Sequence, residues 1–200
     1  MKAALVVVLG ILAGVTAHAA LVTYDFEDVP LGRVPTFTDT RSGVVANFST
    51  LDPSGLDVYQ NSGLFLLPPF MGHAVNNGTG FPIIIQFSAS LGSAALDFGT
   101  DNLPGISPSV TLKAYEGGPG GALVASISTL GTVVAEFPQG TATISGPAFD
   151  TLVVSGTQPG LAIDNLTVST VPEPSSTLLV FSAAVVLIAR ARGVFLARGR

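Results

Sequence analysis

Between residues 21 and 169 the chain alternates short runs of Val, Ile, Thr, Phe and Tyr with clusters of Gly, Pro, Asn and Asp. The branched and aromatic residues favour β-strands, and the residues between them favour turns. No stretch of this region keeps the 3.6-residue apolar period of an amphipathic helix over about ten residues. The pattern predicts strands at residues 21–26, 44–49, 83–88, 94–98, 110–115, 123–127, 133–137, 142–145, 151–155 and 161–168.

Strands at this spacing, without helices between them, are typical of an antiparallel β-sandwich. We therefore predict an all-β, jelly-roll-like sandwich domain over residues 20–170. Residues 50–82 have the least regular pattern, and residues 64–70 fit either a strand or an apolar loop. Within this part, Asn77-Gly78 predicts a type I′ hairpin turn.

The first nineteen residues have the three parts of a secretory signal peptide. Lys2 provides the positive start, residues 3–15 form the apolar segment, and Ala17-His18-Ala19 is a small-x-small cleavage motif. We predict cleavage directly after Ala19, with Ala17 and Ala19 as the recognised small residues, and export through the Sec route. An uncleaved N-terminal anchor is the alternative interpretation.

The C-terminal segment, residues 171–200, combines an extended hinge, an apolar run and a basic tail. The hinge is Val171-Pro172-Glu173-Pro174, in which the prolines fix φ and remove backbone donors. The apolar run covers residues 177–189, and the basic residues after it are Arg190, Arg192, Arg198 and Arg200. Positive charge of this kind is retained on the cytoplasmic side of a membrane.

We predict that residues 177–197 form a short membrane-anchoring helix. The uninterrupted apolar run is only thirteen residues long, whereas a bilayer span takes roughly twenty. Arg190 and Arg192 would therefore have to extend their charged ends to the membrane surface. A peripheral hydrophobic tail is the alternative.

This three-part ending resembles the PEP-CTERM sorting signal of exported bacterial proteins. The resemblance covers residues 171–200 and is most specific at Val171, Pro172, Glu173 and Pro174. It implies a transient anchor in the inner membrane and processing near Pro-Glu-Pro by an exosortase, a membrane transpeptidase. The processed protein would then be at the cell surface or outside the cell.

Charge and composition exclude some classes of function for the central region. Residues 20–170 hold three basic residues against twelve acidic ones, which gives a net charge of −9. Such a surface repels nucleic acid, so we expect no nucleic-acid partner. The chain has no cysteine, which excludes thiol catalysis and disulfide bonds.

The sequence shows no catalytic constellation, and we predict that the protein is not an enzyme. His73 is the one histidine left after signal-peptide removal, and no nucleophile elbow is present. A further interpretation is a hydrolase that uses two carboxylates. Its candidate acids would be Asp97, Asp101, Glu116 and Glu136.

The acidic motifs Tyr24-Asp25-Phe26-Glu27-Asp28 and Asp164-Asn165 lie in the first and last predicted strands. They resemble the opening and closing strands of jelly-roll carbohydrate-binding modules. The resemblance implies that the two strands lie side by side and that their acids hold a structural calcium ion. Our hypothesis is that Glu27, Asp28 and Asp164 bind Ca²⁺ through oxygen ligands. The alternative is that these carboxylates accept hydrogen bonds from backbone N–H groups in turns.

Residues 161–168 contain a conflict of parity. Leu166 and Val168 share one face of an alternating strand, whereas Ile163 belongs to the other face. Either the strand carries a bulge near Asp164, or Asp164 points toward the core. A buried carboxylate in that position needs a partner.

We predict an exported, non-enzymatic protein of the cell surface or extracellular matrix. The alternative is a carbohydrate-binding module that acts on exopolysaccharide. Tyr59 is its best candidate glycan contact because its neighbours are polar. The absence of Trp and the presence of only three Tyr count against this alternative.

Overall fold

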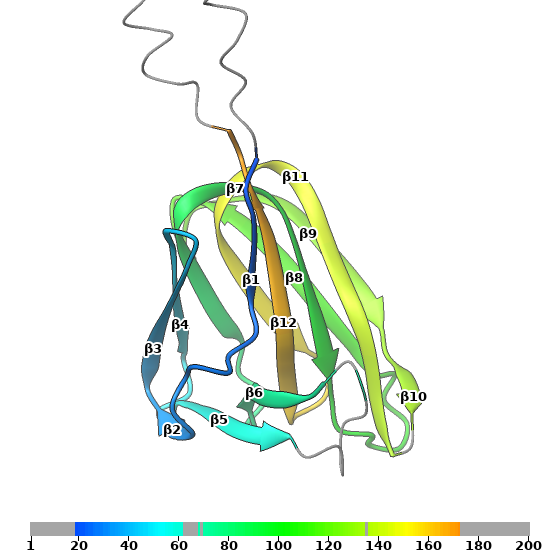
Figure 1. The fold of residues 1–200 in the computed structure, drawn as a ribbon. Coiled ribbons are helices and arrows are strands. Elements are labelled where there is room, and N and C mark those ends of the chain that lie inside the picture. The colour runs from blue at the N-terminus through cyan, green and yellow to red at the C-terminus, as the bar shows by residue number, and fades with distance from the viewer. Residues whose placement is uncertain (1–18, 62–67, 69, 135, 173–200) are drawn as a thin grey trace, which may run out of the picture. The chain divides into compact units, whose positions relative to one another are not determined.

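The computed structural model describes residues 19–61, 68, 70–134 and 136–172. The described part contains strands and no helix (Figure 1), which confirms the all-β prediction. The strands are β1 Leu21–Tyr24, β2 Gly32–Val34, β3 Thr36–Arg41, β4 Val44–Thr50, β5 Leu56–Asn61, β6 Gly72–Asn77, β7 Ile83–Gly99, β8 Ser109–Glu116, β9 Ala122–Leu130, β10 Thr132–Val134, β11 Phe137–Gly156 and β12 Leu161–Thr170. All of them belong to one unit, Ala20–Val171.

The strands form a sandwich of two antiparallel layers that share the long strands β7 and β11 (Figure 1). In the layer that we call the β8 layer, the order is β3, β4, the start of β7, the end of β11, β8 and β9. The β12 layer has the order β2, β5, β6, β12, the end of β7 and the start of β11, with β1 also beside β12 and β10 beside β11. The predicted antiparallel β-sandwich is confirmed.

Strands β7 and β11 are each longer than the sequence pattern predicts. We predicted two strands, 83–88 and 94–98, where β7 is continuous, and likewise 142–145 and 151–155 within β11. Register shifts lie between Ser145 and Phe149 and between Phe149 and Thr151. Bulges of this kind let one strand bend from one layer into the other without ending. The Gly and Pro residues that indicated breaks in the sequence therefore mark bends.

Four strands, β2, β3, β5 and β6, were not predicted, and the hairpin at Asn77-Gly78 was predicted wrongly. Strands β6 and β7 do not pair with each other, because β12 lies between them. Asn77 is instead fully buried, and its side-chain amide donates hydrogen bonds to Thr50 Oγ1 and to the Phe81 carbonyl, both at 2.8 Å. Its role is to tie a loop to the sandwich.

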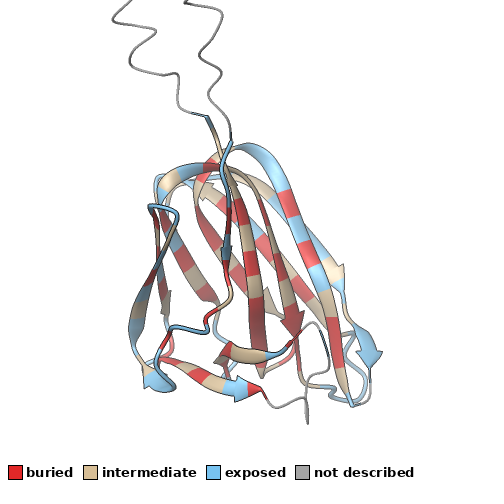
Figure 2. Ribbon diagram, viewed as in Figure 1, coloured by how far each residue is buried: buried red, intermediate tan, exposed pale blue. Residues whose placement is uncertain are grey.

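The core between the layers follows the alternation of the strands (Figure 2). Its largest aromatic group joins Tyr24 and Phe26 to Phe48, with Phe37 stacked on Phe48 at a centroid distance of 4.6 Å. The Tyr24 hydroxyl donates a hydrogen bond to the Val44 carbonyl at 3.0 Å, so the polar end of this buried ring is satisfied.

The first and last strands lie side by side, as the resemblance to jelly-roll modules implied. Strand β1 pairs with β12 from Leu21 opposite Ser169 to Tyr24 opposite Leu166. The parity conflict in β12 is resolved by a bulge, because the register shifts after Asp164 and Asn165 has a positive φ of 49°. The bulge alternative is therefore confirmed. Because of the bulge, Ile163 before it and Leu166 after it both belong to the core.

The predicted signal peptide, residues 1–19, lies outside the described residues except for Ala19. The same holds for the predicted anchoring helix over 177–197 and for Glu173 and Pro174. Within the described ranges, no helix is long and apolar enough to span a membrane.

Candidate functional site

The outer face of the β12 layer carries the side chains that alternate with core residues. Leu56 and Val58 of β5 face the core, so Asp57 and Tyr59 face outward. The pairing of Tyr59 with Ala74 and of Asn76 with Ala162 brings strands β5, β6 and β12 together on this face. A small apolar cluster of Phe70, Ala74 and Ala162 is buried there, separate from the main core.

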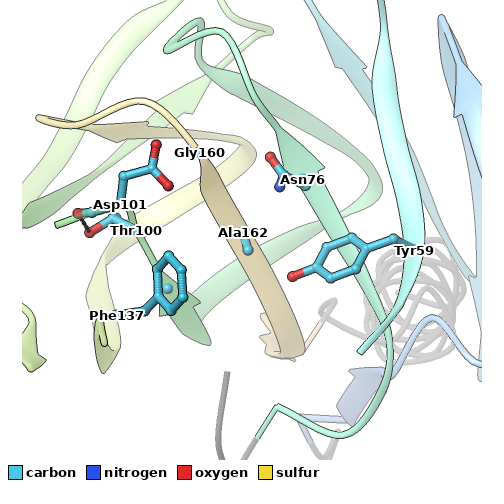
Figure 3. A pocket seen from close by; sticks show the side chains of 8 residues that line it. Tyr59, Asn76, Thr100, Asp101, Phe137, Gly160 and Ala162 are labelled. Carbon is cyan, nitrogen blue, oxygen red and sulfur yellow. Dashed lines mark hydrogen bonds between the residues drawn. The ribbon is translucent and has the colours of Figure 1, made fainter. Parts of the chain in front are cut away.

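A pocket opens where β6 and β7 end and where β11 and β12 begin. Its volume is about 170 Å³, which is room for several water molecules and less than a pocket that encloses a drug-sized ligand. Figure 3 shows the rings of Tyr59 and Phe137 on opposite sides of Ala162. The lining residues are Tyr59, Asn76, Gly99, Thr100, Asp101, Phe137, Gly160 and Ala162.

Tyr59 is held on one side of the pocket by packing against the cluster of Phe70, Ala74 and Ala162. Burial, together with the negative charges of Asp164 and Asp57, raises the pKa of Tyr59 to about 12. The phenol is therefore neutral at physiological pH. It offers a ring face for stacking and a hydroxyl that points toward Ala162 (Figure 3).

Phe137 on the opposite side packs against the same apolar cluster. It is the first residue of β11 and pairs with Val134 at the end of β10. Sequence analysis missed Phe137, since it treated residues 133–137 as an ordinary strand. Local alternation contains no signal that this ring lines the same pocket as Tyr59, because β6, β12 and β7 lie between their strands.

Asp101 is placed beside the two rings by the start of the loop after β7. The amide of Thr100 donates to the Pro138 carbonyl at 3.0 Å, and the amide of Asp101 donates to the Pro159 carbonyl at 3.3 Å. Gly160, with φ of +70°, lies so close to the Asp101 carboxylate that a Cβ would overlap it. The carboxylate thus lies against the backbone of Gly160 at the pocket wall (Figure 3).

The loop that continues from Asp101 is anchored by one buried side chain. Gln158 is only 1% exposed. Its Oε1 accepts a hydrogen bond from the Leu103 amide at 2.9 Å, and its Nε2 donates to the Ile106 carbonyl at 2.7 Å. A buried amide satisfied by two backbone groups fixes the loop to the strand connection before β12.

Two buried oxygens on this face have no hydrogen-bond partner within the described part of the chain, Asn76 Oδ1 and Asp164 Oδ2. Asp164 Oδ1 accepts a hydrogen bond from the Asn165 amide at 2.7 Å, as the bulge permits. Burial raises the pKa of Asp164 to about 7, and the negative charges of Asp97 and Glu27 add to the rise. Unsatisfied buried acceptors are uncommon in native proteins, and a raised pKa lets the Asp164 carboxyl carry its own proton.

The three candidate calcium ligands do not come together as a metal-binding group. Among the described residues, no three His, Asp or Glu side chains are placed to hold a metal ion. Asp28 forms an ion pair with Arg41 at 2.8 Å. Glu27 Oε1 accepts a hydrogen bond from the His73 amide at 2.9 Å. Glu27 and Asp164 each accept a hydrogen bond from a backbone amide, and calcium binding by the three residues stays a prediction.

Two of the remaining candidates, His73 and Asp97, have structural partners. His73 Nδ1 lies 3.2 Å from the Phe26 carbonyl and 3.1 Å from that of Val29, so it fixes the loop between β1 and β2. Asp97 accepts hydrogen bonds from Thr141 at 2.6 Å and Asn165 at 3.1 Å. Of the four acids considered for hydrolysis, Asp101 lines the pocket and the others do not.

Comparisons with known proteins give neighbours in structure only. No protein-family model matches the chain, and no curated protein matches it. The CBM6-3 module of Clostridium stercorarium, solved in complex with cellobiose, is 19% identical, with a TM-score of 0.39 over 62% of this chain and 87% of that chain. The K1 cleaved adhesin domain of Lys-gingipain from Porphyromonas gingivalis is 11% identical, with a TM-score of 0.48 over 76% and 99%. A family 29 carbohydrate-binding module is 15% identical, with a TM-score of 0.38 over 78% and 99%. At these TM-scores the likenesses support neither a ligand nor an activity.

Proposed function

We propose that residues 20–170 form a non-catalytic, jelly-roll-like carbohydrate-binding domain and that the pocket between Tyr59 and Phe137 holds a sugar ring. The observation that carries this proposal is the pair of aromatic rings on opposite sides of Ala162, with polar groups beside them. A pyranose presents apolar C–H faces and a rim of hydroxyl groups. An aromatic face next to a few placed polar groups matches both features.

The polar groups of the pocket suit hydroxyl recognition. Asn76 provides an amide, Thr100 a hydroxyl and Asp101 a carboxylate. An amide and a hydroxyl can each donate and accept hydrogen bonds, as sugar hydroxyl groups do. The small volume favours one ring of a chain that continues out of the pocket.

Binding accounts for this site better than hydrolysis does. Glycoside hydrolysis by the usual route takes two carboxyl groups on either side of the scissile bond. Asp101 is the one carboxylate among the described residues that line the pocket. The neighbouring Asp97 is engaged by Thr141 and Asn165.

The test is a glycan array followed by titration calorimetry on the full-length protein. Tyr59→Ala and Phe137→Ala are expected to weaken binding about tenfold each, because stacking on one ring contributes about 1 kcal/mol or more. Tyr115→Ala is the matched control, since Tyr115 is a partly buried tyrosine of β8 that does not line the pocket. Absence of binding to any glycan, or equal losses in all three variants, would exclude the proposed site.

For the ends of the chain we propose export and PEP-CTERM-type sorting, which would deliver this domain to the cell surface or the surrounding matrix. The proposal rests on Ala17 and Ala19 at one end and on Val171-Pro172-Glu173-Pro174 with its apolar and basic tail at the other. The intact mass of the protein from the native envelope and medium tests it. A species that lacks residues 1–19 and ends near Pro174 is expected, and a mass that retains Arg200 would refute processing.

A further inference from the structure

The charges around the pocket have one sign. No Lys, Arg or His is among the described residues that line it, whereas Asp101 forms part of its wall. Asp57 lies on the same outer face, near enough to Tyr59 for its charge to act on the phenol, and it stands opposite Arg33 of β2. A ligand that enters this pocket therefore meets the Asp101 carboxylate and no cation among the described residues that line it.

The basic residues of the domain do not offset this charge at the pocket. Arg41 is engaged by Asp25, Asp28 and Asp39 at 2.9, 2.8 and 3.1 Å. Arg33 stands opposite Asp57 on the edge strand β2 and does not line the pocket. Lys113 is on β8, in the other layer of the sandwich.

Tyr59, Asn76 and Thr100 bring neutral donors and acceptors to the pocket, and its one charged side chain is an acceptor. The Asp101 carboxylate, when ionised, accepts and does not donate. A ligand matched to such a site brings donors, and a protonated amine brings three donors together with a positive charge. A uronate or a sulfate ester brings acceptors and a negative charge.

We infer that the pocket selects glycans with a protonated amino group, such as oligomers of 2-amino-2-deoxyhexose, over neutral glycans, and that it rejects glycans of uronic acids. This inference rests on the proposed function and names the class of sugar. Asp101 is the partner of the amine, because it lines the pocket and its carboxylate lies against Gly160 at the pocket wall. Tyr59 and Phe137 hold the apolar faces of the same sugar ring.

The test compares four short oligosaccharides of similar length by titration calorimetry with the full-length protein near pH 6. They are a β-1,4-linked glucosamine oligomer, its N-acetylated counterpart, a cello-oligosaccharide and an oligogalacturonate. The glucosamine oligomer is expected to bind at least tenfold more tightly than the N-acetylated and neutral oligomers, and the oligogalacturonate is expected not to bind. Added salt should reduce the preference, as it does for exposed charge pairs.

Two substitutions distinguish a local contact from the general attraction of a cation to an acidic domain. Asp101→Asn keeps the shape of the side chain and removes its charge, so the preference for the amine should disappear while neutral glycans still bind. Glu116→Gln removes one charge from an exposed position outside the pocket and should leave the preference unchanged. Thermal melting of both variants checks that they are folded.

The other possible results would overturn either this inference or the proposed function. Equal affinity for the amine and neutral oligomers would overturn the inference and leave the proposed carbohydrate-binding function standing. Equal reductions in Asp101→Asn and Glu116→Gln would assign the preference to net charge and also overturn it. Failure of all four oligosaccharides and of the glycan array to bind would refute the proposed function itself.

Discussion

Gly160 and Asp101 are in direct contact, and the contact leaves no room for a side chain on Gly160. A Cβ at this position would overlap the Asp101 carboxylate, and its φ of +70° is strained for any other L-residue. We therefore expect Gly160→Ala to displace Asp101 from the pocket wall. Glycan affinity should fall about tenfold, and the free energy of unfolding should fall by about 1–3 kcal/mol.

Gly120→Ala is the matched control for Gly160→Ala. Nothing lies within 4 Å of a Cβ placed at Gly120, and its φ is not positive. Calorimetric binding and thermal melting of both variants check the expectation. Wild-type glycan affinity in a folded Gly160→Ala protein would show that the position of Asp101 does not matter for binding.

Asp164 should make the stability of the domain depend on pH. Its pKa is about 7 in the folded protein, above the ordinary value of 3.8, so the folded domain keeps a proton that the unfolded chain releases. The stabilisation is complete below about pH 4 and is lost as pH rises to about 7. Asp164→Asn removes this dependence. At pH 8 the variant should be more stable than the wild type by about 2 kcal/mol, because no buried charge remains.

The measurement is urea unfolding of the two proteins at a series of pH values from 4 to 8. The difference in free energy of unfolding between them should change sign or shrink toward the acid end, where wild-type Asp164 is protonated. Asp57→Asn is a control at a less buried aspartate of the same face. A constant difference across the pH range would contradict a raised pKa for Asp164.

Gly72 and Glu27 join the loop after β1 to the start of β6. A Cβ on Gly72 would overlap the Glu27 carboxylate, which accepts a hydrogen bond from the His73 amide at 2.9 Å. Gly72→Ala should therefore cost more than the strain of its φ of +82° alone. We expect a loss of about 2–3 kcal/mol in the wild type and a smaller loss in the Glu27→Ala background.

A double-mutant cycle measured by chemical denaturation gives this coupling directly. The interaction free energy should be about 1 kcal/mol, since removal of the carboxylate removes the overlap. Additive effects of Gly72→Ala and Glu27→Ala would mean that the glycine is required for its backbone conformation only.

Local patterns predicted those parts of the fold that depend on neighbours along the chain. The opposite parity of Ile163 and Leu166 predicted either a bulge near Asp164 or an Asp164 that points toward the core, because a strand alternates strictly unless a residue is inserted. The register shift after Asp164 shows the bulge. Strands β7 and β11 could not be predicted as continuous, since Gly92 and Gly146 are equally typical of turns. These glycines lie at bends and not at turns because β7 and β11 pair with strands of both layers, and the local sequence does not contain that information.

The candidate site was predicted only in part for the same reason. Tyr59 could be proposed from its polar neighbours. Phe137 lines the same pocket only because the strands are arranged in the order β5-β6-β12-β7-β11, and no local pattern predicts that order. The acidic cluster at Glu27 and Asp28 suggested calcium. Arg41, which pairs with Asp28, belongs to a strand that the sequence pattern did not predict.

Ala162 lies between the two aromatic rings in the lining of the pocket. A larger side chain at this position would fill the pocket and leave every proposed binding side chain in the sequence. Ala162 is 2% exposed and packs in the cluster with Phe70 and Ala74. In Ala162→Leu the larger side chain should extend into the open volume of about 170 Å³. Glycan affinity should then fall below detection, while stability changes by less than about 1.5 kcal/mol because the added apolar surface offsets any strain.

Ala122→Leu at the exposed start of β9 is the control for added apolar surface. Binding is measured by calorimetry and folding by thermal melting for both variants. Undiminished binding to a folded Ala162→Leu protein would place the ligand elsewhere on the domain, because no sugar ring could then lie between Tyr59 and Phe137. Loss of binding in Ala162→Leu alone, with an unchanged melting temperature, would place the ligand between the two rings.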